Sequence, residues 1–549
     1  MNDWPARWPQ EYRAAQEHWA ALGFKETVVG GDIAFVGDVR SRLKIAGAWE
    51  EKVFQVAIVY PPAFPYVQPR VDFLEPAIRY SRHLQEGKPC LFPPEDWDPT
   101  VPPSEIYKKL MSWLRGYRTG VWTNELPLYE LPAYFRSSGI NVLIAKETLP
   151  SISGHQRGTF SVQRFDGYAV AVLASVDNVR VGKALSADLG LRQAGRLNGK
   201  WYRLSAEPEP TFDERHLLAV LARNGHERRP DARRTPQYVG LVFPDLHLGS
   251  EHLWLLRVAP KDSKARRPVP QGWSITSMPV HLVSHEETFK RLEGVRDVKE
   301  LDAKKVTIFG CGAIGSHLAK ALCREGVGAF RLGDPDVLKP GNVVRHALDL
   351  TAVGRGKAGA LAEALHRISP HCEAETVFER LSEPASLQQH FQDSDVVVAA
   401  IGDDVQEAML SEIAVTAEST PLVLVRTLHA GSAYRVCLIR PGRDACMTCL
   451  GLHDEDDHTG WIAVPADDLL PIYDNGCASR SRPGAGIASE EAALRAAEVV
   501  LELLEGEDSE ANNWLTVRKP ITGGDPRLRG RGTYESVLTP HDECRWCAA

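Results

Sequence analysis

Long hydrophobic runs and basic blocks are both missing from this sequence. No stretch of about 18 apolar residues is present, which is the length that a membrane-spanning helix needs. The start, which bears Trp and Glu residues, is unlike a secretory signal peptide. The 64 lysines and arginines are outnumbered by 72 aspartates and glutamates, for a formal net charge of -8. We therefore expect a cytoplasmic protein with neither a membrane nor a nucleic acid among its partners.

Length and composition predict several globular domains. Single hydrophobic cores seldom grow past roughly 250 to 300 residues, so 549 residues with 43% hydrophobic content favour three or four domains. The motifs divide the chain into three regions, which are residues 1–137, 138–280 and 281–549. The predicted fold class is α/β, with an α+β first region, an α/β middle region and a Rossmann-like last region.

The middle region carries no motif that points to chemistry. Three strand-like runs and one helical segment predict a separate α/β domain, and they occupy residues 168–174, 238–243, 253–258 and 213–222. A polar stretch rich in Lys, Arg and Pro at 259–270 indicates a loop. We expect this region to position the two regions that flank it.

The ten cysteines fall into groups with different expected roles, because thiols in a reducing compartment serve as metal ligands, nucleophiles or small apolar side chains. Four lie in or beside apolar patterns and are predicted to be buried packing residues: Cys311, Cys323, Cys372 and Cys437. Four more form two C-x-x-C units, which are Cys446 with Cys449 and Cys544 with Cys547. Each unit can place two thiolates on one metal. Together they predict a structural, tetrahedral zinc site, with a redox role as the alternative.

A glycine-rich turn follows the apolar run at 306–309. Gly310, Gly312 and Gly315 have the spacing G-x-G-x-x-G and precede a helix-like segment. Glycines at this spacing permit a tight turn and let the backbone approach a phosphate held at a helix N-terminus. The motif alone is a weak signal, because ordinary dinucleotide sites share it. The residues that follow decide which nucleotide is expected.

Charged residues after the glycine turn favour a triphosphate over a nicotinamide dinucleotide. Asp334 ends the next predicted strand, where an acid in a dinucleotide fold holds ribose hydroxyls. Arg345 and Lys357 can neutralise phosphate oxygens, and Asp403, at the end of another buried strand, can hold Mg2+. Each charge taken singly is typical of a solvated surface group. Their joint order predicts ATP and Mg2+. A NAD-dependent oxidoreductase is a poor alternative, because a nicotinamide site does not need these charges.

The C-terminal region resembles the adenylating family that includes ubiquitin-activating enzymes and the bacterial adenylyltransferases of the thiamine and molybdopterin pathways. The matching residues, in the family's order, are Gly310, Gly312, Gly315, Asp334, Asn342, Arg345, Lys357 and Asp403. The resemblance implies that a protein's C-terminal carboxylate attacks the α-phosphate of ATP. Arg345 and Lys357 would stabilise the developing charge, and Asp403 would hold the metal. His346 and Asp404 depart from the family, which commonly has Gln and Asn there.

The same resemblance extends to a second cysteine and to a dimer. Cys477 lies in a Gly- and Arg-bearing loop before a helix predicted at 489–504, as in the family's crossover loop, with a hinge at 484–486. The resemblance implies that Cys477 takes the acyl group from the adenylate as a thioester; a loop thiol without chemistry is the alternative. It also implies a homodimer in which Arg291 or Arg296 reaches the partner's ATP.

The first region resembles the ubiquitin-conjugating enzyme fold. The matching residues are Tyr60-Pro61, Phe64-Pro65, Pro69, His83, Gly87-Lys88-Pro89-Cys90-Leu91 and Trp97-Asp98-Pro99. In that family the cysteine before leucine, Cys90 here, carries the modifier as a thioester. The family's His-Pro-Asn is absent, because Leu84 and Gln85 follow His83, and the role of the Asn would pass to Gln85, to His83 or to backbone amides. A packed thiol in an inactive, adaptor-like domain is the alternative for Cys90.

Taken together, the resemblances imply one polypeptide for consecutive steps: activation by ATP, transfer to Cys477, transfer to Cys90 and acylation of a target amine. Tethering makes the handover intramolecular. The order of regions resembles bacterial fusion enzymes of antiphage CBASS operons and related fusions in bacterial ubiquitin-like operons. The implied partners are a ubiquitin-like modifier, or a protein with a comparable C-terminal tail, and a target with an acceptor amine. Two other hypotheses are a sulfur-carrier-protein adenylyltransferase with a non-catalytic N-terminal module, and a non-catalytic scaffold.

Overall fold

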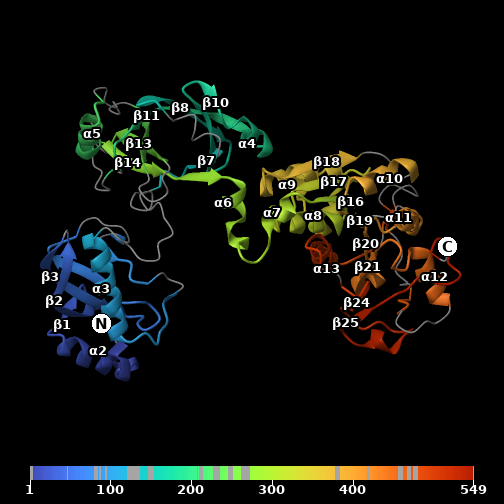
Figure 1. Ribbon diagram of the computed structural model, residues 1–549, viewed down its shortest axis with the longest axis horizontal. Helices are drawn as coiled ribbons and strands as arrows, with labels where there is room; N and C mark the ends of the chain where they lie inside the picture. Colours follow the sequence, from blue (N-terminus) through green and yellow to red (C-terminus); the bar gives the residue numbers. More distant parts are fainter. Residues whose placement is uncertain are drawn as a thin grey trace. The chain divides into compact units, whose positions relative to one another are not determined.

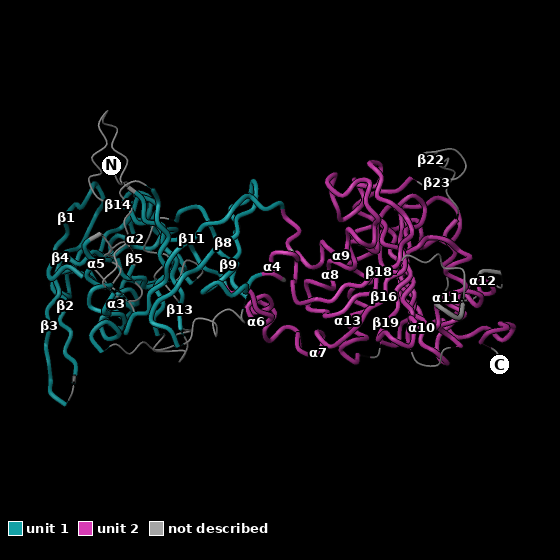
Figure 2. The backbone as a smooth tube through the Cα atoms, turned by 90° about the horizontal axis from the view of Figure 1, so that it is seen from above, with its two compact units in different colours: residues 1–182, 192–281 teal, residues 183–191, 282–549 magenta. Residues whose placement is uncertain are grey.

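The computed structural model describes residues 4–547 except 46, 79–83, 86–87, 93–95, 120–136, 146–153, 207, 209–213, 227–234, 245–250, 261–272, 378–383, 417–419, 456–461, 466–471, 474–479, 482 and 508. The chain divides into two compact units, which are considered separately: residues 1–182 with 192–281, and residues 183–191 with 282–549 (Figure 2). None of the described helices is both long enough and apolar enough to cross a lipid bilayer.

The first unit begins with a four-stranded antiparallel meander between helices (Figure 1). Its elements are α1 (Trp4–Arg7), α2 (Pro9–Ala21), β1 (Lys25–Val29), β2 (Asp32–Ile45), β3 (Ala48–Tyr60), β4 (Arg70–Glu75) and α3 (Pro103–Thr119). The core is aromatic, because Trp4, Trp19 and Tyr60 are fully buried, and the Trp19 indole N–H donates to the Tyr60 hydroxyl over 2.9 Å.

The middle of the chain forms a nine-stranded sheet. Its strands are β7 (Asn141–Ala145), β8 (Arg157–Phe165), β9 (Val170–Val176), β10 (Val179–Arg180), β11 (Gln193–Arg203), β12 (Gln237–Pro244), β13 (Glu251–Pro260), β14 (Trp273–Met278) and β15 (Val280–Val283). They pair in the order β14-β13-β12-β11-β8-β9-β7-β15, with β10 beside β9. Helix α5 (Glu214–Arg223) packs Leu217 and Leu221 against Leu241 and Trp254 on one face. The three predicted strands and the predicted helix are all present.

The second unit is built on an eight-stranded sheet, ordered β18-β17-β16-β19-β20-β21-β24-β25 (Figure 1). Its strands are β16 (Lys305–Phe309), β17 (Ala329–Gly333), β18 (Glu373–Val377), β19 (Val396–Ala399), β20 (Leu422–Leu428), β21 (Ala433–Ile439), β24 (Asn513–Val517) and β25 (Gly532–Ser536). The first five in spatial order are parallel and the last three are antiparallel additions. The strand order reverses between β16 and β19, which is where open parallel sheets place their ligands. The prediction of a Rossmann-like last region is confirmed.

Helices cover both faces of this sheet because its parallel strands are apolar on both sides. Val306 and Ile308 of β16 face a core shared with α8 (Gly315–Arg324), α9 (Lys357–Ile368) and α13 (Gly486–Leu504). Phe309 and Val397 face a second core shared with α10 (Pro384–Gln392), α11 (Asp404–Thr416) and α12 (Met447–Glu455). This layering holds the ends of β16 and β19 rigid, so the loops that follow them start from a defined position.

Candidate active site

The glycine loop at the end of β16 lies against the end of β19. Gly310 has φ +90°, and a Cβ built on it would meet the Ala400 carbonyl oxygen at 2.5 Å. A Cβ on Gly315 would overlap the carbonyl oxygen of Gly310, whereas one on Gly312 would meet no atom within 4 Å. Gly310 and Gly315 are therefore required by the backbone itself. Gly312 leaves one side of the loop open, at the N-terminus of α8, where the backbone N–H groups and the helix dipole favour an anion.

Asp334 anchors this loop from the end of β17. Its carboxylate is 8% exposed and accepts the N–H of Cys311 at 2.9 Å and that of Asp336 at 2.8 Å. Burial raises the pKa of Asp334, and the nearby charge of Lys357 opposes that rise. The residue expected to bind ribose is thus also a structural acceptor that fixes the backbone of the glycine loop.

His346 holds the loop from the other side. One ring nitrogen, Nε2, lies 2.7 Å from the Cys311 carbonyl oxygen, and the other, Nδ1, accepts the N–H of Leu348 at 3.1 Å. These partners assign the proton to Nε2 in a neutral ring. Burial lowers the pKa of His346 to about 4, so the ring stays neutral near pH 7. The departure from the family's usual Gln therefore keeps one donor and one acceptor in place.

Lys357 stands beside this loop, and Arg345 directly precedes His346 in the chain. Lys357 begins α9, is 12% exposed, and its Nζ donates to the Asp336 carboxylate at 2.9 Å. Its charge acts on both Asp334 and the buried Cys311 thiol. Arg345 ends the 3-10 helix η5 (Pro340–Arg345), which Asn342 caps by accepting the Lys339 N–H at 3.0 Å. The structure therefore brings Lys357 to the glycine loop and gives Asn342 a capping role.

Arg345 also touches the segment that leads out of the predicted crossover loop. A Cβ on Gly484 would stand 3.1 Å from Nη1 of Arg345, and one on Gly486 would meet the Val344 carbonyl oxygen at 2.8 Å. The backbone carbonyl of Arg345 lies 3.2 Å from Nε2 of His317 in α8. The absence of side chains at the two glycines allows this close packing, so the predicted hinge lies directly against Arg345, the arginine predicted to contact phosphate.

Asp403 follows β19 and caps α11. Its Oδ1 accepts the N–H groups of Val405 at 3.1 Å and Gln406 at 3.0 Å, and its side chain is exposed. The neighbouring Asp404 accepts from Arg426 at 2.7 Å, and Arg426 also pairs with Glu407.

Glu407 is fully buried and accepts the Gly402 N–H at 2.8 Å. Burial raises the pKa of Glu407, and Arg426 opposes that rise. Sequence reasoning missed this ion pair. The signal available was an acid at the fourth position of α11 and an arginine that follows four apolar residues of β20.

The two C-x-x-C units converge into one cluster. The Sγ atoms of Cys446, Cys449, Cys544 and Cys547 all lie within 4.8 Å of one another. The Cys446 Sγ stands 3.7 Å from that of Cys449 and 3.5 Å from that of Cys544. Tetrahedral Zn–S bonds of about 2.3 Å place sulfur atoms about 3.8 Å apart, so the cluster fits zinc. A redox pair would require only two thiols. Here four thiols meet, two from residues 446–449 at the start of α12 and two from residues 544–547.

Of the two predicted nucleophiles, only Cys90 is among the described residues. Cys90 directly follows β6 (Lys88–Pro89), which pairs with β5 (Leu84–Gln85), and its half-buried Sγ lies 3.7 Å from the Phe92 carbonyl oxygen. Gln85 lies in β5 opposite Lys88. Cys477 and His83 lie outside the described residues. The predicted packing cysteines Cys311, Cys323, Cys372 and Cys437 are all buried.

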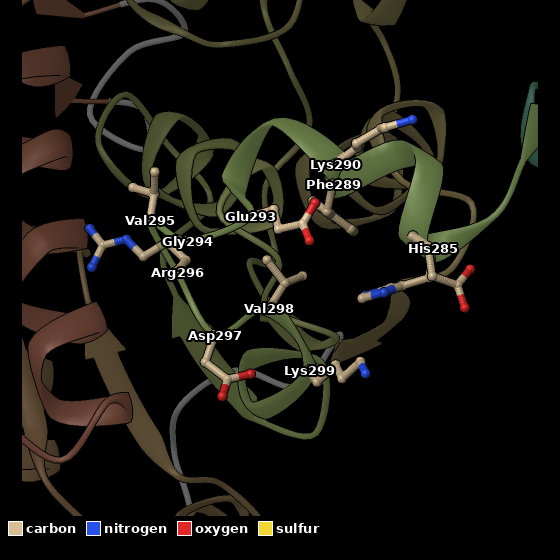
Figure 3. Close-up of a pocket in the computed structure, with 11 residues that line it drawn as sticks. His285, Phe289, Lys290, Glu293, Gly294, Val295, Arg296, Asp297, Val298 and Lys299 are labelled. Carbon is tan, nitrogen blue, oxygen red and sulfur yellow. The ribbon is translucent and has the colours of Figure 1, made fainter. Parts of the chain in front are cut away.

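A cavity of about 640 Å³ is lined by residues that precede β16 in the chain (Figure 3). Its lining comes from α6 (His285–Phe289), the 3-10 helix η4 (Lys290–Leu292) and α7 (Val298–Asp302) with their connections. Arg296 lines it and pairs with Glu505 at 2.6 Å and Glu325 at 3.3 Å; Figure 3 shows its guanidinium directed away from His285. Arg291, the other predicted arginine, is exposed.

Comparisons with known proteins match the second unit to one family. The profile of the ThiF family matches residues 284–516. Over 119 residues, 21% of this chain, the sequence is 42% identical to the ATP-dependent ubiquitin transferase-like protein Cap2 of Enterobacter hormaechei subsp. hoffmannii (strain UCI 50), of which it covers 19%. Over 160 residues, 27% of this chain, it is 32% identical to the adenylyltransferase and sulfurtransferase MOCS3 of Mus musculus, of which it covers 34%.

A longer but more distant match extends over most of the chain. Over 537 residues, 85% of each chain, the sequence is 23% identical to the uncharacterized protein y4qC of Sinorhizobium fredii (strain NBRC 101917 / NGR234). For three other matches among the curated relatives, the alignment spans less than half of the relative's length, at 19%, 43% and 42%. Residues 284–516 thus match the ThiF family model, and the chain resembles bacterial ubiquitin transferase-like proteins.

Proposed function

We propose that this chain uses ATP to activate the C-terminal carboxylate of a ubiquitin-like protein, or of a protein with a comparable tail, and then conjugates it to a target amine. One observation carries the first step. The glycine loop, open at Gly312, stands at the reversal point of the sheet with Lys357 beside it and Asp403 on the next strand end. A ThiF-family domain with this arrangement supports adenylation rather than hydride transfer.

The proposed adenylation assigns a task to each residue at this edge of the sheet. A carboxylate oxygen of the modifier attacks the α-phosphorus of ATP, the bond to the β-phosphate breaks, and pyrophosphate leaves. Lys357 and Arg345 neutralise the charge that grows on the phosphate oxygens, and the loop N–H groups hold the phosphates. Mg2+ bound at Asp403 would screen charge on the departing pyrophosphate. The four-cysteine cluster would hold zinc away from this chemistry and attach the tail to α12.

Two thioester transfers complete the proposal. The Cys477 thiolate attacks the acyl carbon of the adenylate and releases AMP; the Cys90 thiolate then attacks the thioester and frees Cys477. A deprotonated target amine displaces Cys90 and forms an amide. The position of Arg345 against Gly484 supports this order, because the segment that follows Cys477 in the chain touches a residue of the adenylation site.

The N-terminal elements support a conjugating role for the first region. Helices α1 and α2, a four-stranded meander, a segment carrying Cys90 and helix α3 follow one another, and the core is closed by aromatic side chains. Cys90 is half-buried, so its thiol is accessible in part, as a transfer thiol must be. The boundaries 1–137, 138–280 and 281–549 for conjugating, middle and adenylating domains belong to the same proposal.

The proposed assembly is a homodimer with an arginine supplied across the interface. Arg296 is already paired with two carboxylates of its own unit, so Arg291 is the better candidate for contact with the partner's ATP. We also propose a role in bacterial antiphage defence, on the resemblance of the region order to CBASS fusion enzymes. The genes adjacent to this one test that role, because a neighbouring ubiquitin-like gene without a cyclic-nucleotide synthase would instead favour a ubiquitin-like operon.

A second candidate is a sulfur-carrier-protein adenylyltransferase with a non-catalytic N-terminal module. It is favoured by the 32% identity to the protein named adenylyltransferase and sulfurtransferase MOCS3. A third, a scaffold with a vestigial nucleotide site, predicts no ATP–pyrophosphate exchange in the presence of any modifier. The cysteine variants separate the first two, because only conjugation requires Cys90.

The decisive experiment incubates the protein with ATP and candidate modifiers and resolves thiol-sensitive adducts on a non-reducing gel. Two adducts are expected. Cys90→Ala should lose one of them, and Cys477→Ala should lose both because Cys90 is charged through Cys477; exchange should be retained in both variants. Cys437→Ala, which removes a buried thiol, serves as the matched control. Adducts that survive both changes contradict the relay. Product formation that survives Cys90→Ala but not Cys477→Ala supports the sulfur-carrier alternative.

A further inference from the structure

One face of the nine-stranded sheet is only partly covered by helix α5. Cross-strand register places Tyr202, Val239 and Leu241 on the face that packs against α5. Side chains alternate along a strand, so Lys200 and Asn198 of β11 lie on this same face. Beyond the α5 core the face becomes polar, and Asn198 and Lys200 are exposed there.

A cavity of about 680 Å³ lies over this polar part. Its lining includes Tyr202 and Val239, so one end adjoins the α5 core. The remaining polar side chains come from β8, β9 and the turn that follows it, β11 and β12: Thr159, Ser161, Ser175, Asn178, Arg196, Asn198, Lys200, Gln237 and Tyr238. Volumes of about 300–1,000 Å³ are typical of sites for small molecules. The sheet thus offers a hollow of ligand size outside the ThiF-family domain.

The polar groups of this hollow are ordered by buried hydrogen bonds. Gln163 is 3% exposed, and its Nε2 donates to the carbonyl oxygens of Arg164 at 2.9 Å and Gly195 at 3.0 Å. Its Oε1 accepts Nε of Arg196 at 3.1 Å, and Arg196 has no other partner among the described residues. The outer edge of the guanidinium is thus left to a ligand. The hydroxyls of Ser161 and Ser175 lie 2.6 Å apart on the floor.

The charge of the hollow has one sign. The described lining contains Arg196 and Lys200 and no acidic residue. Asp177 lies close in the chain, but its carboxylate accepts the Thr159 N–H at 2.7 Å and lies against Gly158, on the opposite face of β8. A guanidinium with a free edge, an ammonium and several hydroxyl and amide donors are the groups that bind phosphate oxygens.

Arg157 adds to this positive field. It is paired with Tyr202 across β8 and β11, and its charge opposes the rise in pKa that burial gives the Tyr202 hydroxyl. The positive potential therefore extends along the strands to the edge of the α5 core. At that edge, an apolar or aromatic part of a ligand would lie next to Tyr202 and Val239.

We propose that this hollow binds a phosphate monoester of a small molecule the size of a nucleotide, with Arg196 and Lys200 holding the phosphate. The site is independent of adenylation at the glycine loop. Uridine monophosphate is the probe, because its base differs from the adenine expected at the glycine loop. Calorimetric titration of the full-length protein should show saturable binding that inorganic phosphate displaces.

The double variant Arg196→Gln, Lys200→Gln tests the assignment. Losing two charged contacts should weaken uridine monophosphate binding about tenfold or more. The control Arg164→Gln, Arg115→Gln removes two exposed arginine charges elsewhere in the same unit and should leave binding unchanged. All four side chains are exposed, but Arg196→Gln also removes the hydrogen bond to Oε1 of the buried Gln163. The melting temperature of each variant is therefore measured as well, and binding is compared well below it. Three results would overturn the proposal: no saturable binding, equal binding in the double variant, or no displacement by inorganic phosphate.

Discussion

The contrast between two neighbouring glycines gives the sharpest test of the nucleotide site. In Gly310→Ala the new Cβ meets the Ala400 carbonyl oxygen at 2.5 Å, in a backbone with φ +90°. The left-handed conformation alone costs about 1–2 kcal/mol for an L-residue, and the overlap with a strand carbonyl adds to that cost. This variant should therefore be less stable and should lose ATP binding as a consequence.

Gly312→Ala should separate stability from binding. Its Cβ would meet no protein atom within 4 Å, so the substitution should leave stability unchanged or raise it by about 0.4–1 kcal/mol. The methyl group would instead occupy the open side of the loop, where a phosphate must approach the N–H groups. Losing one charge-assisted hydrogen bond costs about 1.5–3 kcal/mol, which weakens ATP binding roughly ten- to hundredfold.

Thermal unfolding without ligand and ATP–pyrophosphate exchange measure the two effects separately. Gly451→Ala in α12, where a Cβ also meets nothing within 4 Å, is the matched control and should bind ATP normally. Wild-type ATP affinity in Gly312→Ala would refute the loop as a phosphate cradle. A loss of stability in Gly312→Ala equal to that in Gly310→Ala would show that the loop is not open at Gly312.

Three further perturbations have defined outcomes. Protonation of His346, with a pKa lowered to about 4 from 6.5, disfavours the native state. The contribution of neutral His346 to the free energy of unfolding is therefore complete above pH 6.5 and is lost as the pH falls toward 4, by roughly 3 kcal/mol at most. In His346→Gln, the free energy of unfolding measured across this range should depend less on pH. Cys544→Ser should lower the zinc content from about one per chain, measured by atomic emission, together with the melting temperature. Arg426→Met leaves the buried Glu407 carboxylate unpaired and should cost about 3–5 kcal/mol in urea unfolding, part of which the added change Glu407→Gln should restore.

Local sequence pattern was sufficient for the elements that carry the motifs. The apolar run before Gly310 is β16, the run before Gly402 is β19, and the Ala- and Leu-rich stretch is α13, because burial on both faces or on one helical stripe leaves a periodic signature. The C-x-x-C spacing likewise predicted paired thiols. That the two units serve one metal was a prediction, and the convergence of the four sulfur atoms is a property of the fold.

Tertiary structure alone decided how the site is held together. No sequence rule indicates that Gly310 must pass the Ala400 carbonyl, that His346 accepts and donates to fix the loop, or that Gly486 must lack a side chain where it passes the Val344 carbonyl. Each contact joins segments far apart in the chain, and their meeting is set by strand order and helix packing rather than by local propensity. The same holds for the hollow over β8 and β11, whose scattered polar residues share a face only once the register of the strands is known.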